Sequence, residues 1–180
     1  MISPAAGIVV WLGASLVVVS DGRRALAAGI ALMTIGLAAF AFLTAGPLAA
    51  APVAVGGAIA AARRYFSGAA GWAILPPGST PRLVLCIATA LIAFWVAAGV
   101  TSGALTSLRF AVTVATVLPA ARALSTTREA VLLTAVAVLA LSIGSAGAIG
   151  SSSPSLWPYL AGGLVAAAVG WLPLRTASAA

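Results

Sequence analysis

Charge and titratable side chains are scarce in this chain, and their scarcity excludes most kinds of soluble protein. Only 6% of the 180 residues are charged, against roughly 25% in an ordinary soluble domain, and 63% are hydrophobic. The sequence has no histidine, no lysine, one cysteine and two acids, Asp21 and Glu129. An internal disulfide is therefore excluded, and we expect neither a metal site nor a cofactor.

The two acids are both interpreted as helix-capping residues. Asp21 lies directly before an apolar run, where a carboxylate can accept hydrogen bonds from the first backbone N–H groups of a helix. Thr126 and Glu129 have the spacing of a capping box. General acid–base catalysis and proton relays through a membrane both need titratable groups that are available for the task. We therefore predict that the chain is not an enzyme.

Long apolar runs fill most of the sequence and predict an all-α integral membrane protein. A helix that crosses a bilayer needs about 20 mainly apolar residues. The length accommodates a polytopic bundle of about seven such helices, or six if two runs are fused, within one transmembrane domain over residues 1–180. The predicted spans are 4–20, 25–45, 48–62, 83–103, 105–120, 130–150 and 159–174.

The arginines set the expected orientation. With the N-terminus outside, eight of the nine fall in the cytoplasmic segments 21–24, 63–82, 121–129 and 175–180. None falls in the external segments 45–47, 103–104 and 151–158. This is the positive-inside pattern, and it predicts a cytoplasmic C-terminus and a multi-pass protein of the bacterial cytoplasmic (inner) membrane. We expect these arginines to contact anionic lipids, so the net charge of +7 does not indicate nucleic-acid binding.

Arg109 is the remaining arginine and the only charged residue inside a predicted span. A helix over Leu105–Ala120 places it within a sector of about 80° together with Thr106, Thr113 and Thr116. Arg109 lies about one turn inside the external end, from where its side chain can reach the outer headgroups. Alternatively, this seam faces the protein interior and contacts an anionic lipid or ligand, a partner's carboxylate or a transported substrate.

Small residues predict how the helices pack. Gly56 and Ala60 are four residues apart, a spacing that lets helix backbones approach closely in a membrane. Such Gly/Ala-rich faces are also the expected contacts with other integral membrane subunits. The longest loop, Ser67–Arg82, carries Trp72, which we expect at the membrane interface together with Tyr65. The loop is either a connector or a docking surface for a soluble partner.

Two segments resemble parts of known membrane-protein families. The segment Ser107–Leu133, with its Leu108-Arg109 pair and its closing Thr-Thr-Arg-Glu129, resembles a stretch of the transmembrane T-component of energy-coupling-factor vitamin transporters. That family's long charged coupling helices have no counterpart here. Val18–Leu43 resembles the opening hairpin of small antiporter-like subunits of respiratory complexes and membrane hydrogenases, without their membrane glutamates. We assign the chain to neither family.

Two functions follow as predictions. The very short loops, the small-residue faces and the lack of titratable groups favour a non-catalytic subunit that scaffolds or stabilises a larger inner-membrane complex. Respiratory and other energy-converting complexes are among the candidates. The alternative is the membrane component of a small-molecule transporter, a permease or substrate-binding subunit of the energy-coupling-factor kind, with a site around Arg109.

Overall fold

The computed structural model describes residues 2–67, 70–75, 79–100, 106–150 and 155–172. In these residues the chain forms seven α-helices and no β-strand. The helices are α1 (Ile2–Val19), α2 (Arg23–Ala45), α3 (Pro47–Phe66), α4 (Thr80–Val100), α5 (Thr106–Ser125), α6 (Glu129–Gly150) and α7 (Trp157–Trp171). For the described residues, the prediction of an all-α fold is confirmed.

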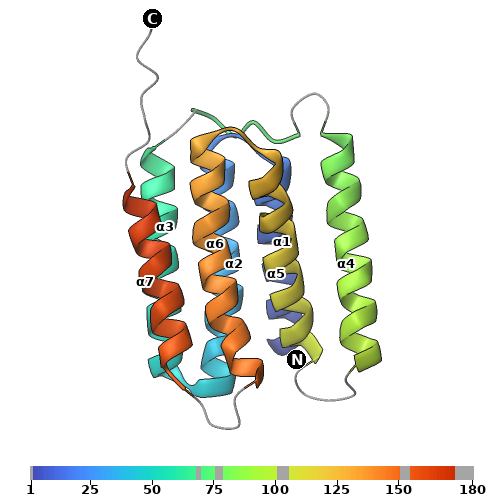
Figure 1. The fold of residues 1–180 in the computed structure, drawn as a ribbon, viewed down its shortest axis with the longest axis vertical. Helices are drawn as coiled ribbons and strands as arrows, with labels where there is room; N and C mark the ends of the chain where they lie inside the picture. Colours follow the sequence, from blue (N-terminus) through green and yellow to red (C-terminus); the bar gives the residue numbers. More distant parts are fainter. Residues whose placement is uncertain (1, 68–69, 76–78, 101–105, 151–154, 173–180) are drawn as a thin grey trace, which may run out of the picture.

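The helices run alternately up and down and form two layers (Figure 1). Helices α1, α2 and α3 make one layer, and α5, α6 and α7 pack against it. The most extensive contacts join α2 to α1 and α3, and join α7 to α3 and α6. Helix α4 stands at the edge of the bundle, where it contacts α5 and, to a smaller extent, α1.

Each predicted span coincides with a helix, and the largest differences lie at arginine-bearing ends. Helix α3 continues to Phe66 and so includes Arg64, whereas the prediction ended at Ala62. Helix α5 continues past Ala120 to Ser125 and includes Arg122. The prediction ended both spans before the arginine-bearing segments, but Arg64 and Arg122 are buried in the bundle, and the helices include them. The predicted span ends at 101–103, 105 and 173–174 lie outside the described residues.

The reversal between α2 and α3 depends on one glycine. Gly46 ends α2, where its N–H donates to the carbonyl oxygen of Phe42 at 3.0 Å, and it also precedes Pro47 at the start of α3. Its φ of 83° is a backbone conformation that favours glycine. The two apolar runs are therefore separate antiparallel helices, as predicted, and they are not fused into one.

Glycines also let the helix backbones touch inside the bundle. A Cβ added to Gly13 would stand 2.7 Å from a backbone nitrogen of α2, so α1 and α2 meet at the backbone there. Gly56 of α3 lies against Gly163 of α7, and Gly57 lies against Thr34 of α2. The predicted packing face of α3 is confirmed, and it is occupied within this chain.

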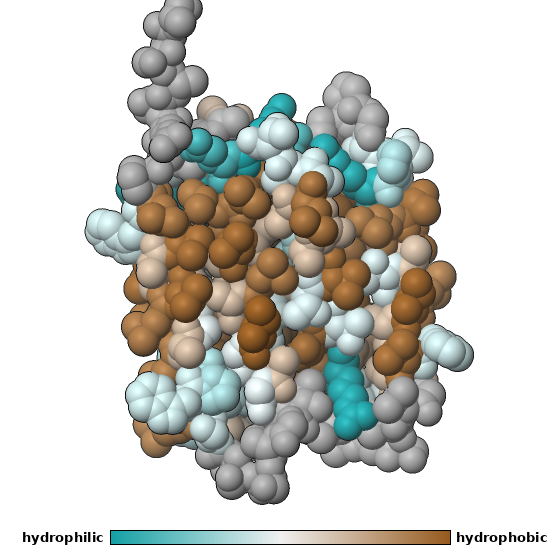
Figure 2. Space-filling model, viewed as in Figure 1, coloured by the Kyte–Doolittle hydropathy of each residue, from teal (hydrophilic) through white to brown (hydrophobic). Residues whose placement is uncertain are grey.

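The apolar surface of the bundle fits a membrane. Within the described residues, four helices are long and apolar enough to cross a bilayer, over Arg23–Ala45, Thr80–Ala98, Thr106–Ser125 and Glu129–Gly147. Figure 2 shows a broad hydrophobic band around the middle of the visible face, with the hydrophilic surface gathered at one end. One further hydrophilic patch lies near the opposite end of the visible face.

Candidate functional site

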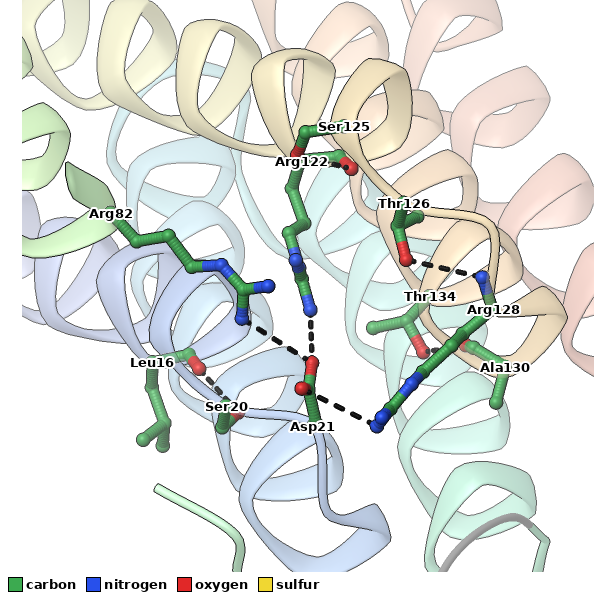
Figure 3. Close-up of polar contacts among 10 residues, drawn as sticks. All are labelled: Leu16, Ser20, Asp21, Arg82, Arg122, Ser125, Thr126, Arg128, Ala130 and Thr134. Atoms are coloured by element: carbon green, nitrogen blue, oxygen red, sulfur yellow. Dashed lines mark hydrogen bonds and ion pairs between the residues drawn. The ribbon is translucent and has the colours of Figure 1, made fainter. Parts of the chain in front are cut away.

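One carboxylate gathers three arginines at the end of the bundle where α1 turns into α2. Asp21 lies in this turn, and its Oδ1 accepts a hydrogen bond from Nη2 of Arg122 in the last turn of α5 (Figure 3). Nη1 of Arg82, at the start of α4, lies 3.6 Å from the same oxygen. Nη1 of Arg128, in the α5–α6 connection, lies 3.3 Å from Oδ2. Segments that are far apart in the sequence therefore meet at one side chain.

Burial separates the strong contact of this cluster from the weak ones. The side chains of Arg122 and Asp21 are only 2% and 9% exposed, so both charges leave water and depend on each other. Arg128 is exposed and Arg82 is partly exposed, and water weakens such ion pairs to about 1 kcal/mol or less. One carboxylate facing three guanidinium groups leaves the cluster with two positive charges in excess.

The turn that carries Asp21 is held by the segment 70–75. The N–H of Asp21 donates to the carbonyl oxygen of Ala73 at 3.1 Å. Gly22 lies directly beneath the crossing segment, because a Cβ at this position would stand 2.5 Å from the carbonyl oxygen of Gly71. Part of the predicted loop 67–82 is thus fastened to the α1–α2 turn by backbone hydrogen bonds.

The interpretation of Asp21 as a helix cap is wrong. The residue that caps the N-terminus of α2 is Gly22, and no side-chain hydrogen bond caps this helix. The carboxylate faces the guanidinium groups of Arg82, Arg122 and Arg128 instead. At the start of α6, the Thr126 hydroxyl accepts a hydrogen bond from the N–H of Arg128 at 3.2 Å. In a capping box this hydroxyl would accept from the next N–H, that of Glu129.

The predicted site on α5 is a half-buried seam whose hydroxyl groups bond to their own helix. Thr113 donates to the carbonyl oxygen of Arg109 at 2.8 Å, and Thr116 donates to that of Val112 at 2.7 Å. Thr106 lies in the wall of a cleft of about 340 Å³ between α1, α4 and α5. Arg109 is half-buried. Whether the seam binds a ligand stays a prediction.

A second arginine is almost as deeply buried as Arg122. Arg64, in the last turn of α3, is only 5% exposed. Its Nε and Nη1 atoms are buried and have no hydrogen-bond acceptor among the described residues. It follows Gly57 and Ala60 by seven and four positions, so it shares their inward face. Its neighbour Arg63 points elsewhere, with its guanidinium carbon 5.6 Å from the ring centre of Trp171.

The chemistry available at these places is electrostatic. Asp21 is engaged by three arginines, and Glu129 lies on the surface. Within the described part of the chain, no group of three or more His, Cys, Asp or Glu side chains gathers that could hold a metal ion. The cysteine, Cys86, is a buried free thiol. The arrangement can bind anions and tie segments together.

The sequence contained a signal for the Asp21 cluster that residue-by-residue interpretation missed. The orientation predicted from the arginine count placed Asp21, Arg82, Arg122 and Arg128 on the same side of the membrane. Helices of alternating direction bring the ends of α1 and α5 and the start of α4 together on that side. An acid that lies among arginines at one bundle end is a natural counter-charge for them. Pairing Asp21 with these arginines requires the order and direction of the helices, which the spacing of neighbouring residues in the sequence does not give.

Comparisons with protein-family models, with curated proteins and with solved structures find no match. Function is therefore inferred from the geometry of this chain alone.

Proposed function

We propose that this chain is a non-catalytic polytopic membrane subunit that stabilises a larger complex in the bacterial cytoplasmic membrane. In this proposal all seven helices cross the bilayer, the N-terminus lies outside and the arginine-rich end faces the cytoplasm. The alternating direction of the helices and the position of Arg23, Arg64 and Arg122 at one end support this orientation. Partner subunits meet the chain along α4.

The observation behind the proposal is the sparse burial of α4. Only 22% of its span is buried in the bundle, against 44–56% for the other three helices that are long and apolar enough to cross a membrane. Its exposed side chains are large and point to several sides, and they include Leu83, Val84, Ile87, Leu91, Ile92, Phe94 and Trp95. At the arginine-rich end, α4 is tethered to Asp21 by the partly exposed Arg82.

The expected occupant of this face is a membrane-spanning helix of another subunit. Helices in a membrane associate by close packing. Inside this chain, Gly13, Gly56 and Gly163 bring helix backbones into contact. These small-residue faces are already occupied within the bundle. Helix α4 instead offers large side chains on sides that no helix of the chain covers, which suits a partner helix with small residues.

The proposal is tested by photo-crosslinking in the native membrane. A photoreactive amino acid replaces Leu91 on α4, and the control variant carries it at Ile35 on α2, which is equally apolar and equally exposed (65% and 62%). In parallel, the tagged wild-type chain is purified in a gentle detergent and its companions are identified by mass spectrometry. We expect one integral membrane protein to co-purify in stoichiometric amount and to crosslink to position 91 but not to position 35.

Two results would contradict it. If the chain purifies alone as a stable monomer, it is not a subunit of a complex. If the co-purified protein crosslinks equally to both positions, the contact is not made by α4.

The alternative function is a transporter component with a site around Arg109. The cleft of about 340 Å³ favours it, because this cleft lies near the same end of the bundle as Arg109 and has Thr106, Phe94 and Phe110 in its wall. On this proposal Arg109→Ala abolishes uptake of the substrate. Unchanged uptake of every candidate substrate in this variant would exclude the site.

A further inference from the structure

A second concave surface lies between α2 and α3, close to the arginine-rich end. It is a groove of about 530 Å³ whose floor consists of five alanines from the two helices. Arg24, Tyr65 and Trp72 complete its lining. All three lie at the arginine-rich end of the bundle. Arg24 is in the first turn of α2, Tyr65 is in the last turn of α3, and Trp72 is in the segment that follows α3. The groove is thus apolar along the helices and cationic and aromatic at one end.

The segment that carries Trp72 is fixed to the helices beside the groove. The N–H of Arg24 donates to the carbonyl oxygen of Gly71 at 3.3 Å, and the N–H of Leu75 donates to that of Val19 at 3.1 Å. Ala73 and Leu75 adopt φ angles of 37° and 53°, which non-glycine residues rarely do and which the surrounding structure must hold in place. Trp72 is therefore an anchored part of the groove.

We propose that this groove binds an anionic phospholipid. The phosphate of the headgroup pairs with the Arg24 guanidinium, and one acyl chain lies along the alanine floor between α2 and α3. Tyr65 and Trp72 flank the glycerol region, since both side chains combine an apolar ring with a polar group that suits this depth. The inference depends on membrane placement with the arginine-rich end at headgroup level, and it is independent of any partner at α4.

The shape and the charge of the groove together favour a lipid over a free anion. From Arg24 to Ala31 the floor continues for about 10 Å along α2, at 1.5 Å per residue. A soluble phosphate would use the cation and leave this apolar length empty. Basic pockets between membrane helices at the cytoplasmic side are suited to anionic headgroups, and each arginine near the surface strengthens binding about fivefold.

Native mass spectrometry of the purified chain in mild detergent tests the proposal, with phosphatidylglycerol, phosphatidylcholine or inorganic phosphate added at equal concentration. Arg24→Gln removes the cation, and its control Arg63→Gln removes an exposed arginine at the same end, outside the groove and facing Trp171. Ala62→Leu fills the groove. Its control Ala51→Leu changes another exposed alanine on the same face of α3, three turns away.

We expect the wild-type chain to retain phosphatidylglycerol in preference to phosphatidylcholine. Arg24→Gln should lower phosphatidylglycerol binding about fivefold, and Ala62→Leu should lower binding of both lipids. Both control variants should stay within about twofold of the wild type, a margin well inside the loss of one such charge contact.

Three results would overturn the proposal. The first is unchanged lipid binding in Arg24→Gln. The second is an equal loss in Arg63→Gln, which would indicate attraction to the whole charged end. The third is displacement of the lipid by inorganic phosphate at the same concentration, which would indicate a free-anion site. Arg24→Gln alters an exposed side chain, so the test remains decisive even if Ala62→Leu fails to fold.

Discussion

Asp21 and Arg122 form a buried ion pair at the arginine-rich end of the bundle. Each is buried, and each compensates the charge of the other, so the pair is more costly to break than to keep. The carboxylate also receives Arg82 and Arg128 from two further segments. A single substitution of Asp21 therefore removes the ion pairs to all three arginines at once.

Asp21→Asn should destabilise the protein by about 3–5 kcal/mol, because it leaves Arg122 charged and buried without a counter-charge. The measurement is the free energy of unfolding in mixed micelles with increasing denaturing detergent. Glu129→Gln is the control, since it neutralises the other acid at an exposed position and should cost about 0.5 kcal/mol or less.

The double variant Asp21→Asn/Arg122→Met sharpens this prediction. Removing both partners leaves no uncompensated charge at this buried position, so the double variant should be more stable than Asp21→Asn alone. A single Asp21→Asn variant that unfolds like the wild type would show that the cluster contributes nothing to stability.

At the scale of elements, the segment 70–75 is the least regular part that the structure describes, yet it is well anchored. Its backbone bonds to the α1–α2 turn at Asp21 and Arg24. The crossing requires that Gly22 has no side chain, and the φ of Gly22 is an ordinary −85°, so space and not backbone conformation demands glycine there.

Gly22→Ala should release the segment 70–75 from the turn, because its Cβ would collide with the backbone of Gly71 and Trp72. We expect faster proteolytic cleavage within this segment and a red-shifted Trp72 emission. Gly7→Ala is the control, since a Cβ there meets the Phe110 side chain at an ordinary 3.4 Å and the substitution favours the helix. If Gly22→Ala is cleaved no faster than Gly7→Ala, the crossing segment is not held as described.

For the whole molecule, the proposed orientation makes a prediction about the two ends of α6. Single cysteines replace Thr127 or Ser155, which are both exposed and lie on either side of this helix, in a Cys86→Ala background. A membrane-impermeant maleimide should label Ser155→Cys in intact cells and label Thr127→Cys only after the membrane is made permeable. The reverse pattern would invert the orientation, and labelling of both in intact cells would mean that α6 does not cross the membrane.

The seven helices and the reversal between residues 45 and 48 followed from the sequence alone. Long apolar runs can satisfy their backbone groups in a membrane only as helices, and Gly-Pro and the arginines mark where those runs end. The same logic predicted the close packing at Gly56. These features are local, since each depends on a residue's own conformational and solvation preferences.

The partners of individual side chains were decided by the tertiary structure. Asp21 has the sequence context of a helix cap, and it became the centre of an arginine cluster because alternating helices bring Arg82, Arg122 and Arg128 to the same end. The burial of Arg64 could not be predicted from the sequence, because it depends on which helices pack around the end of α3. The edge position of α4 could not be predicted either, because a helix face has the same apolar composition whether lipid or another helix covers it. Sequence determined which segments are helices, and packing determined which charges meet.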